Sequence, residues 1–254
     1  SIVNKLMTAI ALLIGLGASV VPQPAAASSG EKVVLLHGIA QSESSMRNME
    51  AALKKEGYAT LAITYPSTNH DLEGIAKVLR DEKLSKDFWN QSTKVHFVTH
   101  SMGGLVVRKY LEQYKDVIPQ EKLGRVVMIA PPNRGSDVAD FIHNLRLYKW
   151  YYGPAGQELT TSVQDKNTEP PYYDLGIIAG TKEWPYIVSV FVISGKSDGR
   201  VSVEKTKLKG MTDHITVSAT HSFIHDKPIV HNQVLCFLQT GHFKTAKESV
   251  ASRF

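Results

Sequence analysis

A serine stands at an abrupt change of pattern in the stretch VTHSMGGL, residues 98–105. The residues before Ser101 alternate and are rich in β-branched types, which is typical of a buried strand. The residues after the glycines, LVVRKYLEQY, carry apolar side chains at helical spacing. A chain that changes from strand to helix this quickly needs a strained backbone, and Gly103 and Gly104 let the strand and the helix approach each other. Because such strain usually marks function, we interpret Ser101 as a candidate nucleophile.

A serine hydroxyl is a weak nucleophile near neutral pH, so its chemistry depends on its partners. A histidine must take its proton, and a carboxylate must hold that histidine in the correct tautomer. Two N–H donors must also face the oxyanion that forms when the hydroxyl attacks a carbonyl carbon. In this kind of turn, one donor comes from the residue after the serine and the other from a loop after an early strand.

Alternating strand and helix signals surround this serine. We expect strands in the runs KVVLLHG, YATLAITYP, KVHFVTH and GRVVMIAPP, at residues 32–38, 58–66, 94–100 and 124–132. A helix is expected at 44–57, where Met46, Met49 and Leu53 share one face and Gly57 ends it, with further helices at about 72–84 and after the serine. This alternation predicts an α/β fold, a mostly parallel central sheet with helices on both faces.

The pattern changes after the strand at 124–132. Residues of about 138–174 form a predicted insertion that is rich in aromatic residues, namely Tyr148, Trp150, Tyr151, Tyr152, Tyr172 and Tyr173. These rings either line an apolar pocket or pack the insertion onto the sheet. The runs LGIIAG at 175–180 and IVSVFVISG at 187–195 both fit the next strand, and the sequence leaves the choice open. HITVSAT at 214–220 is the last expected strand, and a helix at 226–241 ends at Gly241.

Composition limits the class of protein and its partners. The 254 residues are 43% apolar, enough for one large core. The 29 Lys and Arg residues outnumber the 24 Asp and Glu residues only slightly and are scattered, so a nucleic-acid partner is not expected. The single cysteine, Cys236, lies in the apolar run VLCFL and is expected to be a buried thiol.

The first residues have the pattern of a secretory signal peptide. Lys5 precedes an apolar run from Ile10 to Val21, and the small residues of PQPAAASSG follow. We expect cleavage near Ala27, which leaves residues 28–254 as one domain that is secreted or periplasmic. The alternative is an uncleaved N-terminal membrane anchor.

Four motifs together resemble the α/β-hydrolase fold, specifically its bacterial lipases and esterases: VVLLHGIAQS, THSMGGL, SDGRVSVEKT and THSFI. The resemblance covers nearly the whole chain after residue 27. It implies that Ser101 is the nucleophile and that Asp198 and His221 complete a triad, in the chain order that this fold imposes. It implies backbone oxyanion donors at Ile39 and Met102, and places the aromatic insertion after the sixth strand of the fold.

One position departs from the family pattern, and several residues also fit a purely structural role. The usual G-x-S-x-G motif has Thr99 in place of its first glycine, although threonine suits the end of a strand. Ser101 could be a helix N-cap, and Asp198 could be an ordinary turn residue in SDG. His37 and His100 are interpreted as structural or pocket-lining residues, and strand alternation points His100 away from the serine.

The reaction expected from such a serine is ester hydrolysis through an acyl-enzyme. An acyltransferase would use the same residues, and a non-catalytic binding protein would be expected to have a broken triad. His221 follows the last strand directly and is the expected base, whereas His225 lies four residues further on. The two histidines form an H-x-x-x-H pattern, but the glutamate of a metalloprotease helix is not present after the first histidine, so no metal is expected. We expect a small-molecule ester or lipid substrate, with Trp150 and Tyr151 as candidate contacts, no cofactor, and no obligate protein partner.

Overall fold

The architecture is a single parallel sheet. The computed structural model describes residues 30–38, 42–136, 153–159, 169–183, 195–246 and 248. Within these residues the six strands have the order β2-β1-β3-β4-β5-β6, and every neighbouring pair is parallel. The strands are β1 (Lys32–Leu36), β2 (Ala59–Ile63), β3 (Val95–His100), β4 (Leu123–Ile129), β5 (Leu175–Gly180) and β6 (Asp213–Val217). Since all strands run the same way, the loops that follow them meet at one edge of the sheet, its carboxyl edge.

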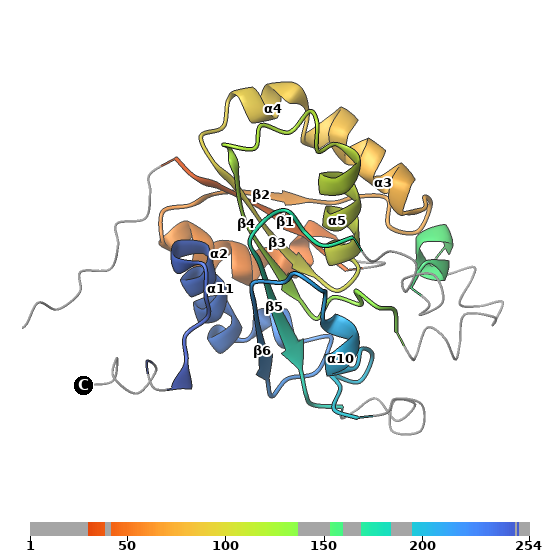
Figure 1. Cartoon of the computed structure of the whole chain (residues 1–254), viewed down its shortest axis with the longest axis vertical. Helices are drawn as coiled ribbons and strands as arrows, with labels where there is room; N and C mark the ends of the chain where they lie inside the picture. The colour runs from red at the N-terminus through yellow and green to blue at the C-terminus, as the bar shows by residue number, and fades with distance from the viewer. Residues whose placement is uncertain are drawn as a thin grey trace, which may run out of the picture.

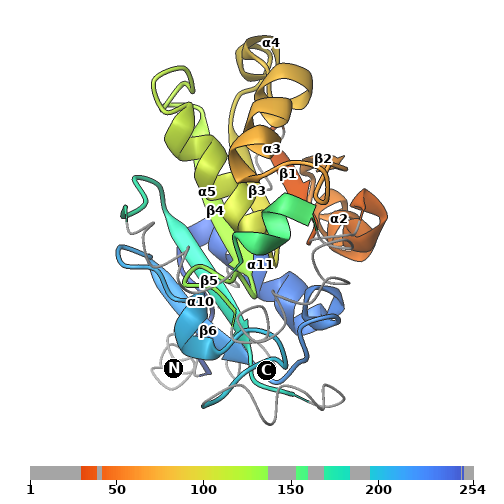
Figure 2. The ribbon, with the colours of Figure 1, turned by 90° about the vertical axis from the view of Figure 1, so that its right-hand side faces the viewer.

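Helices cover both faces of this sheet (Figures 1 and 2). One face carries α2 (Arg47–Lys55), which continues the short helix η1 (Glu43–Met46), and α11 (Pro228–Thr240). The other face carries α3 (Leu72–Val78), its π-helical extension η2 (Leu79–Lys83), α4 (Lys86–Asn90) and α5 (Gly103–Gln113). The short helices α10 (Val203–Thr206) and η3 (Ile224–Asp226) lie in the loops around β6. The predicted layering is therefore confirmed.

Local sequence explains where several helices begin and end. Pro228 occupies the first turn of α11, where its missing N–H costs nothing, and Gly241 ends the helix with φ 82° in the left-handed region. Asp71 caps α3 by accepting a hydrogen bond from the Gly74 N–H at 2.8 Å. Gly57, with φ 90°, lies in the turn between α2 and β2, as the sequence predicted.

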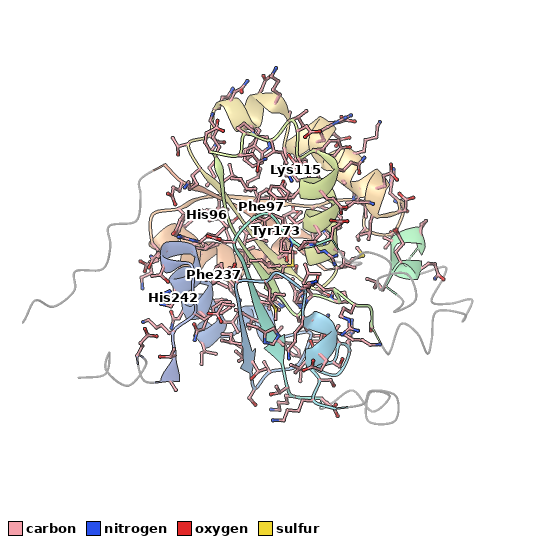
Figure 3. The ribbon with its side chains drawn as sticks, viewed as in Figure 1. His96, Phe97, Lys115, Tyr173, Phe237 and His242 are labelled. Carbon is pink, nitrogen blue, oxygen red and sulfur yellow. The ribbon has the colours of Figure 1, made fainter. Side chains whose placement is uncertain are left out.

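Strand alternation divides the core into two layers. In β3, which is buried along its whole length, Val95 and Phe97 pack against the layer of α3, α4 and α5, and Val98 packs against the layer of α2 and α11. Figure 3 shows Phe97 on the central sheet and Phe237 on α11. The sequence-predicted face of α2 is confirmed, because Met49 and Leu53 are fully buried. Each such side chain contributes about 1.5–3 kcal/mol by leaving water.

The segments around the predicted insertion are described only in part. The strand before it is β4, the fourth in chain order among the described residues, and the run LGIIAG is β5. The competing run at 187–195 lies outside the described residues except for Gly195. Residues 1–29 and most of 138–174 lie outside the described residues too. No helix within the described residues is both long and apolar enough to cross a membrane.

Candidate active site

Ser101 occupies a sharp turn between β3 and α5. Its φ of 54° lies in the left-handed region, which is strained for a residue with a side chain. The turn is held by the Ser101 N–H, which donates to the Ile129 carbonyl on β4 at 2.8 Å. Gly103 is required next to it, because a Cβ there would lie 2.7 Å from the carbonyl oxygens of Leu36 and His37. The strain and the close glycine that the sequence predicted are both present.

The side chains of Ser101, His221 and Asp198, which come from three separate loops, form a hydrogen-bonded chain. The Nε2 atom of His221 lies 2.8 Å from Ser101 Oγ, and its Nδ1 atom lies 2.6 Å from Asp198 Oδ2. All three residues are buried, with relative exposures of 9% for Ser101, 4% for His221 and 0% for Asp198. A carboxylate can only accept, so Nδ1 of His221 carries the proton and Nε2 is free to accept the serine proton. The arrangement can therefore deprotonate the serine hydroxyl.

Asp198 is held by its own loop as well as by the histidine. Its second carboxylate oxygen, Oδ1, accepts hydrogen bonds from the N–H groups of Arg200 at 3.0 Å and Val201 at 2.8 Å. The turn interpretation of SDG thus describes one oxygen of this residue, while the other oxygen faces His221. The loop lies against the end of β5, where a Cβ on Gly180 would be 2.6 Å from both Asp198 Cβ and the Ala219 carbonyl oxygen.

A neighbouring pair also supports this loop. Ser197 is fully buried, and its hydroxyl donates to Glu183 Oε1 at 2.6 Å and accepts from the Gly199 N–H at 3.2 Å. Sequence reasoning missed Glu183, Ser197 and Gly180, because their roles depend on contacts between distant segments. The only available signal was a glycine at the end of the buried run LGIIAG.

The expected oxyanion donors are only partly described. Met102 is fully buried and directly follows the serine, at the start of α5, and its role as a donor stays a prediction. Ile39 lies outside the described residues. The chain leading to it is held by Tyr65, whose hydroxyl donates to the His37 carbonyl and whose ring stacks on the His37 ring at 4.1 Å. Burial lowers the pKa of His37, which favours the neutral imidazole.

The predicted substrate contacts, Trp150 and Tyr151, also lie outside the described residues. A short piece of the insertion, residues 153–159, is described and lies against α3. Glu158 Oε2 accepts a hydrogen bond from the Leu72 N–H at 2.6 Å, although burial raises the pKa of this carboxyl group. Two further observations concern the expectations about a metal ion and about the base, which both stay predictions. Within the described residues no three His, Cys, Asp or Glu side chains are grouped to hold a metal ion, and His225 makes no described contact with Ser101.

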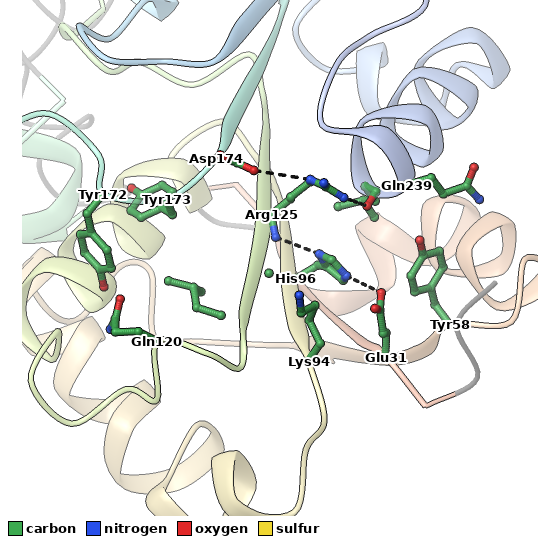
Figure 4. Close-up of a pocket in the computed structure, with 13 residues that line it drawn as sticks. Glu31, Tyr58, Lys94, His96, Gln120, Arg125, Tyr172, Tyr173, Asp174 and Gln239 are labelled. Atoms are coloured by element: carbon green, nitrogen blue, oxygen red, sulfur yellow. Dashed lines mark hydrogen bonds and ion pairs between the residues drawn. The ribbon is translucent and has the colours of Figure 1, made fainter. Parts of the chain in front are cut away.

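A separate cavity of about 370 Å³ opens at the opposite, amino edge of the sheet (Figure 4). Four of its lining residues, Glu31, His96, Arg125 and Asp174, form a connected polar group. The Nε2 atom of His96 lies 2.7 Å from Glu31 Oε2, and its Nδ1 atom accepts a hydrogen bond from the Arg125 N–H at 2.8 Å. The guanidinium group of Arg125 donates to the Leu238 carbonyl at 2.8 Å and lies 3.6 Å from the Asp174 carboxylate. This cavity is separate from the serine, which lies at the carboxyl edge.

The parallel sheet and the strained serine after β3 define the α/β-hydrolase fold, and solved structures share it. Lipase BlEst2 of Bacillus licheniformis in mature form is 19% identical with a TM-score of 0.68, covering 87% of this chain and 94% of that one. The metagenomic carboxyl esterase MGS0156 is 18% identical with a TM-score of 0.64, covering 82% and 70%. Phospholipase PlaB from Legionella pneumophila, in complex with thio-NAD, is 16% identical with a TM-score of 0.65, covering 87% and 60%. At these identities the likeness shows the fold.

Within this fold the chain belongs to a particular family. Residues 17–161 match the family model described as "Domain of unknown function (DUF7379)". Among curated proteins, none matches the sequence.

Proposed function

We propose that this protein is a serine hydrolase that cleaves carboxylic esters through an acyl-enzyme. The observation that carries the proposal is the continuous chain of hydrogen bonds from Ser101 Oγ through the two nitrogens of His221 to Asp198, at 2.8 and 2.6 Å. A serine on a strained turn, a base within reach and a carboxylate behind it are the parts that nucleophilic acyl transfer requires. Structural likeness to lipases and esterases adds support.

The geometry allows each proton to be followed. Ser101 Oγ attacks the ester carbonyl carbon while His221 Nε2 takes its proton, and the resulting oxyanion faces the N–H of Met102 and a second donor proposed at Ile39. His221 then gives the proton to the departing alkoxide, so that an alcohol leaves and the acyl group remains on the serine. Water repeats the sequence, with His221 as its base, and releases the acid. The Asp198 carboxylate accepts from Nδ1 throughout and stabilises the imidazolium.

A labelling experiment tests this proposal. A fluorophosphonate probe should modify Ser101 and abolish hydrolysis of a series of p-nitrophenyl esters, and Ser101→Ala should be neither labelled nor active. Ser92→Ala is the matched control, because Ser92 is also a buried serine but bonds to the Phe88 carbonyl at the end of α4. Labelling of another residue, or full activity in Ser101→Ala, would refute the hydrolase assignment.

We also propose that Trp150 and Tyr151 contact the acyl group. Replacing either by Ala should change the ratio of rates on long and short esters more than it changes the melting temperature. Equal losses on every ester, with a lower melting temperature, would favour a packing role instead.

Export is a further part of the proposal. The signal pattern of residues 1–27 should be removed, and mass spectrometry of the mature protein should find a new N-terminus near Ser28. A chain that keeps residues 1–27 in the membrane fraction would instead indicate an anchor.

A further inference from the structure

The main chain of His221 makes hydrogen bonds to the two segments that carry its side-chain partners, Asp198 and Ser101. Its N–H donates to the Asp198 carbonyl at 2.8 Å, and its carbonyl oxygen lies 2.8 Å from Nε2 of His100. His100 is the last residue of β3 and directly precedes Ser101. We propose that His100 is a positioning residue, which holds the base over the nucleophile through this hydrogen bond to the main chain of His221. This inference rests on the proposed function.

The hydrogen bond fixes the chemical form of His100. A carbonyl oxygen only accepts, so the His100 proton is on Nε2, and Nδ1 has no hydrogen-bond partner among the described residues. The ring is 1% exposed and packs against the rings of His221 at 5.1 Å and His225 at 4.2 Å between centroids. Burial, with the two neighbouring histidines, lowers the pKa of His100 well below its ordinary value. His100 thus remains neutral and adds no repulsion when His221 becomes an imidazolium.

The direction of the side chain shows that His100 acts through His221 and not on substrate. It leaves β3 on the face of α2 and α11, the same face as Val98, whereas Ser101 begins the turn toward α5. Without a donor at this position, the carbonyl of His221 would be a buried, unsatisfied acceptor, and the loop after β6 would have to move to solvate it. Such a movement would displace Nε2 from Ser101 Oγ.

Three substitutions separate the hydrogen bond from packing. His100→Gln keeps an N–H donor on a neutral side chain of comparable reach, His100→Asn places the same amide one methylene too short, and His100→Leu has no donor. We expect the Gln variant to keep kcat within about threefold, and the Asn and Leu variants to lose about 10- to 100-fold in kcat with KM little changed, since misplacement by about 1 Å can cost that much.

His96→Leu is the matched control. His96 lies on the same strand, is equally buried and makes two hydrogen bonds, to Glu31 and to the Arg125 N–H, but at the amino edge of the sheet. It should lower the melting temperature and leave kcat unchanged. If the His100→Leu variant fails to fold, the Asn variant carries the comparison.

The outcomes separate this inference from the proposed function. Full kcat in the Asn and Leu variants overturns the positioning role, and so does an equal loss in all three variants, which would show that the ring shape matters and not the donor. A change confined to KM overturns it as well. Each of these results would leave the inactivity of Ser101→Ala untouched, whereas an active Ser101→Ala would refute the hydrolase proposal itself.

Discussion

Asp198 uses its two carboxylate oxygens for different tasks. Oδ1 accepts two backbone N–H groups and closes the loop, while Oδ2 faces Nδ1 of His221 at 2.6 Å. A residue that only formed the turn would need the hydrogen bonds of Oδ1 and not the one between Oδ2 and His221. The two tasks can be separated by a substitution that keeps one acceptor and turns the other into a donor.

Asp198→Asn makes this separation. The amide oxygen of Asn can keep the bonds to Arg200 and Val201, but its NH₂ group would face His221 and force the proton onto Nε2, where it can no longer accept from Ser101. We expect kcat to fall by about 10⁴-fold with the melting temperature nearly unchanged, measured by ester hydrolysis and thermal unfolding. Asp213→Asn, at the amino end of β6, is the control and should stay active. An active Asp198→Asn variant would leave this aspartate with its turn role alone.

At the scale of elements, β5 packs closely against neighbouring segments at both of its ends. At the carboxyl end, Gly180 lies where a Cβ would be 2.6 Å from Asp198 Cβ and the Ala219 carbonyl oxygen. At the amino end, Gly176 lies where a Cβ would be 2.7–2.8 Å from the rings of Phe243 and Phe237. The same strand therefore offers two overpacking sites, of which only one touches the candidate active site.

Gly180→Ala and Gly176→Ala form a matched pair. Overpacking costs about 1–3 kcal/mol, so both should lower the free energy of unfolding by that order in urea titrations. Only Gly180→Ala should also lower kcat, because the added methyl group must displace the Asp198 loop or the chain after β6. If both variants lose kcat equally, β5 affects activity through general stability, and the Gly180 contact has no special role.

Local patterns predicted those elements whose signals lie within one segment. The apolar face of α2, the end of α11 at Gly241 and the turn at Ser101 follow from spacing, a glycine and a change of period. The structure also brings together the three side chains that the motifs singled out. The choice between LGIIAG and the run at 187–195 could not be made, because both are apolar and of strand length.

The residues that support the site were beyond sequence reasoning for a physical reason. Tyr65 contacts His37 across two strands, Ser197 contacts Glu183 across a loop, and His100 bonds to a main-chain atom 121 positions away. None of these pairs has a fixed spacing in sequence. Alternation correctly placed His100 away from the serine, but it could not indicate the carbonyl that lies on that side.

Across the whole molecule, buried and half-buried histidines lie at both edges of the sheet and share one electrostatic consequence. Burial is the main cause that lowers the pKa of each of these described histidines below its ordinary value of 6.5: His37, His96, His100, His214 and His225. In the unfolded chain these imidazoles are exposed to water, so they bind protons at a higher pH than they do in the folded protein.

The free energy of unfolding should therefore depend on pH just below neutrality. As pH falls through 6.5, the unfolded state binds more protons than the folded state, so stability decreases, and the loss continues down to the lowered pKa values of the folded state. Carboxylates titrate mainly below about pH 5 and add their own effect later. Urea unfolding between about pH 8 and about pH 5 should show this decline. His100→Gln, which removes a fully buried imidazole, should make the decline shallower, whereas His242→Gln, at an exposed position, should not. Equal slopes for the wild type and His100→Gln would show that the folded protein admits a proton at His100 as easily as the unfolded chain does.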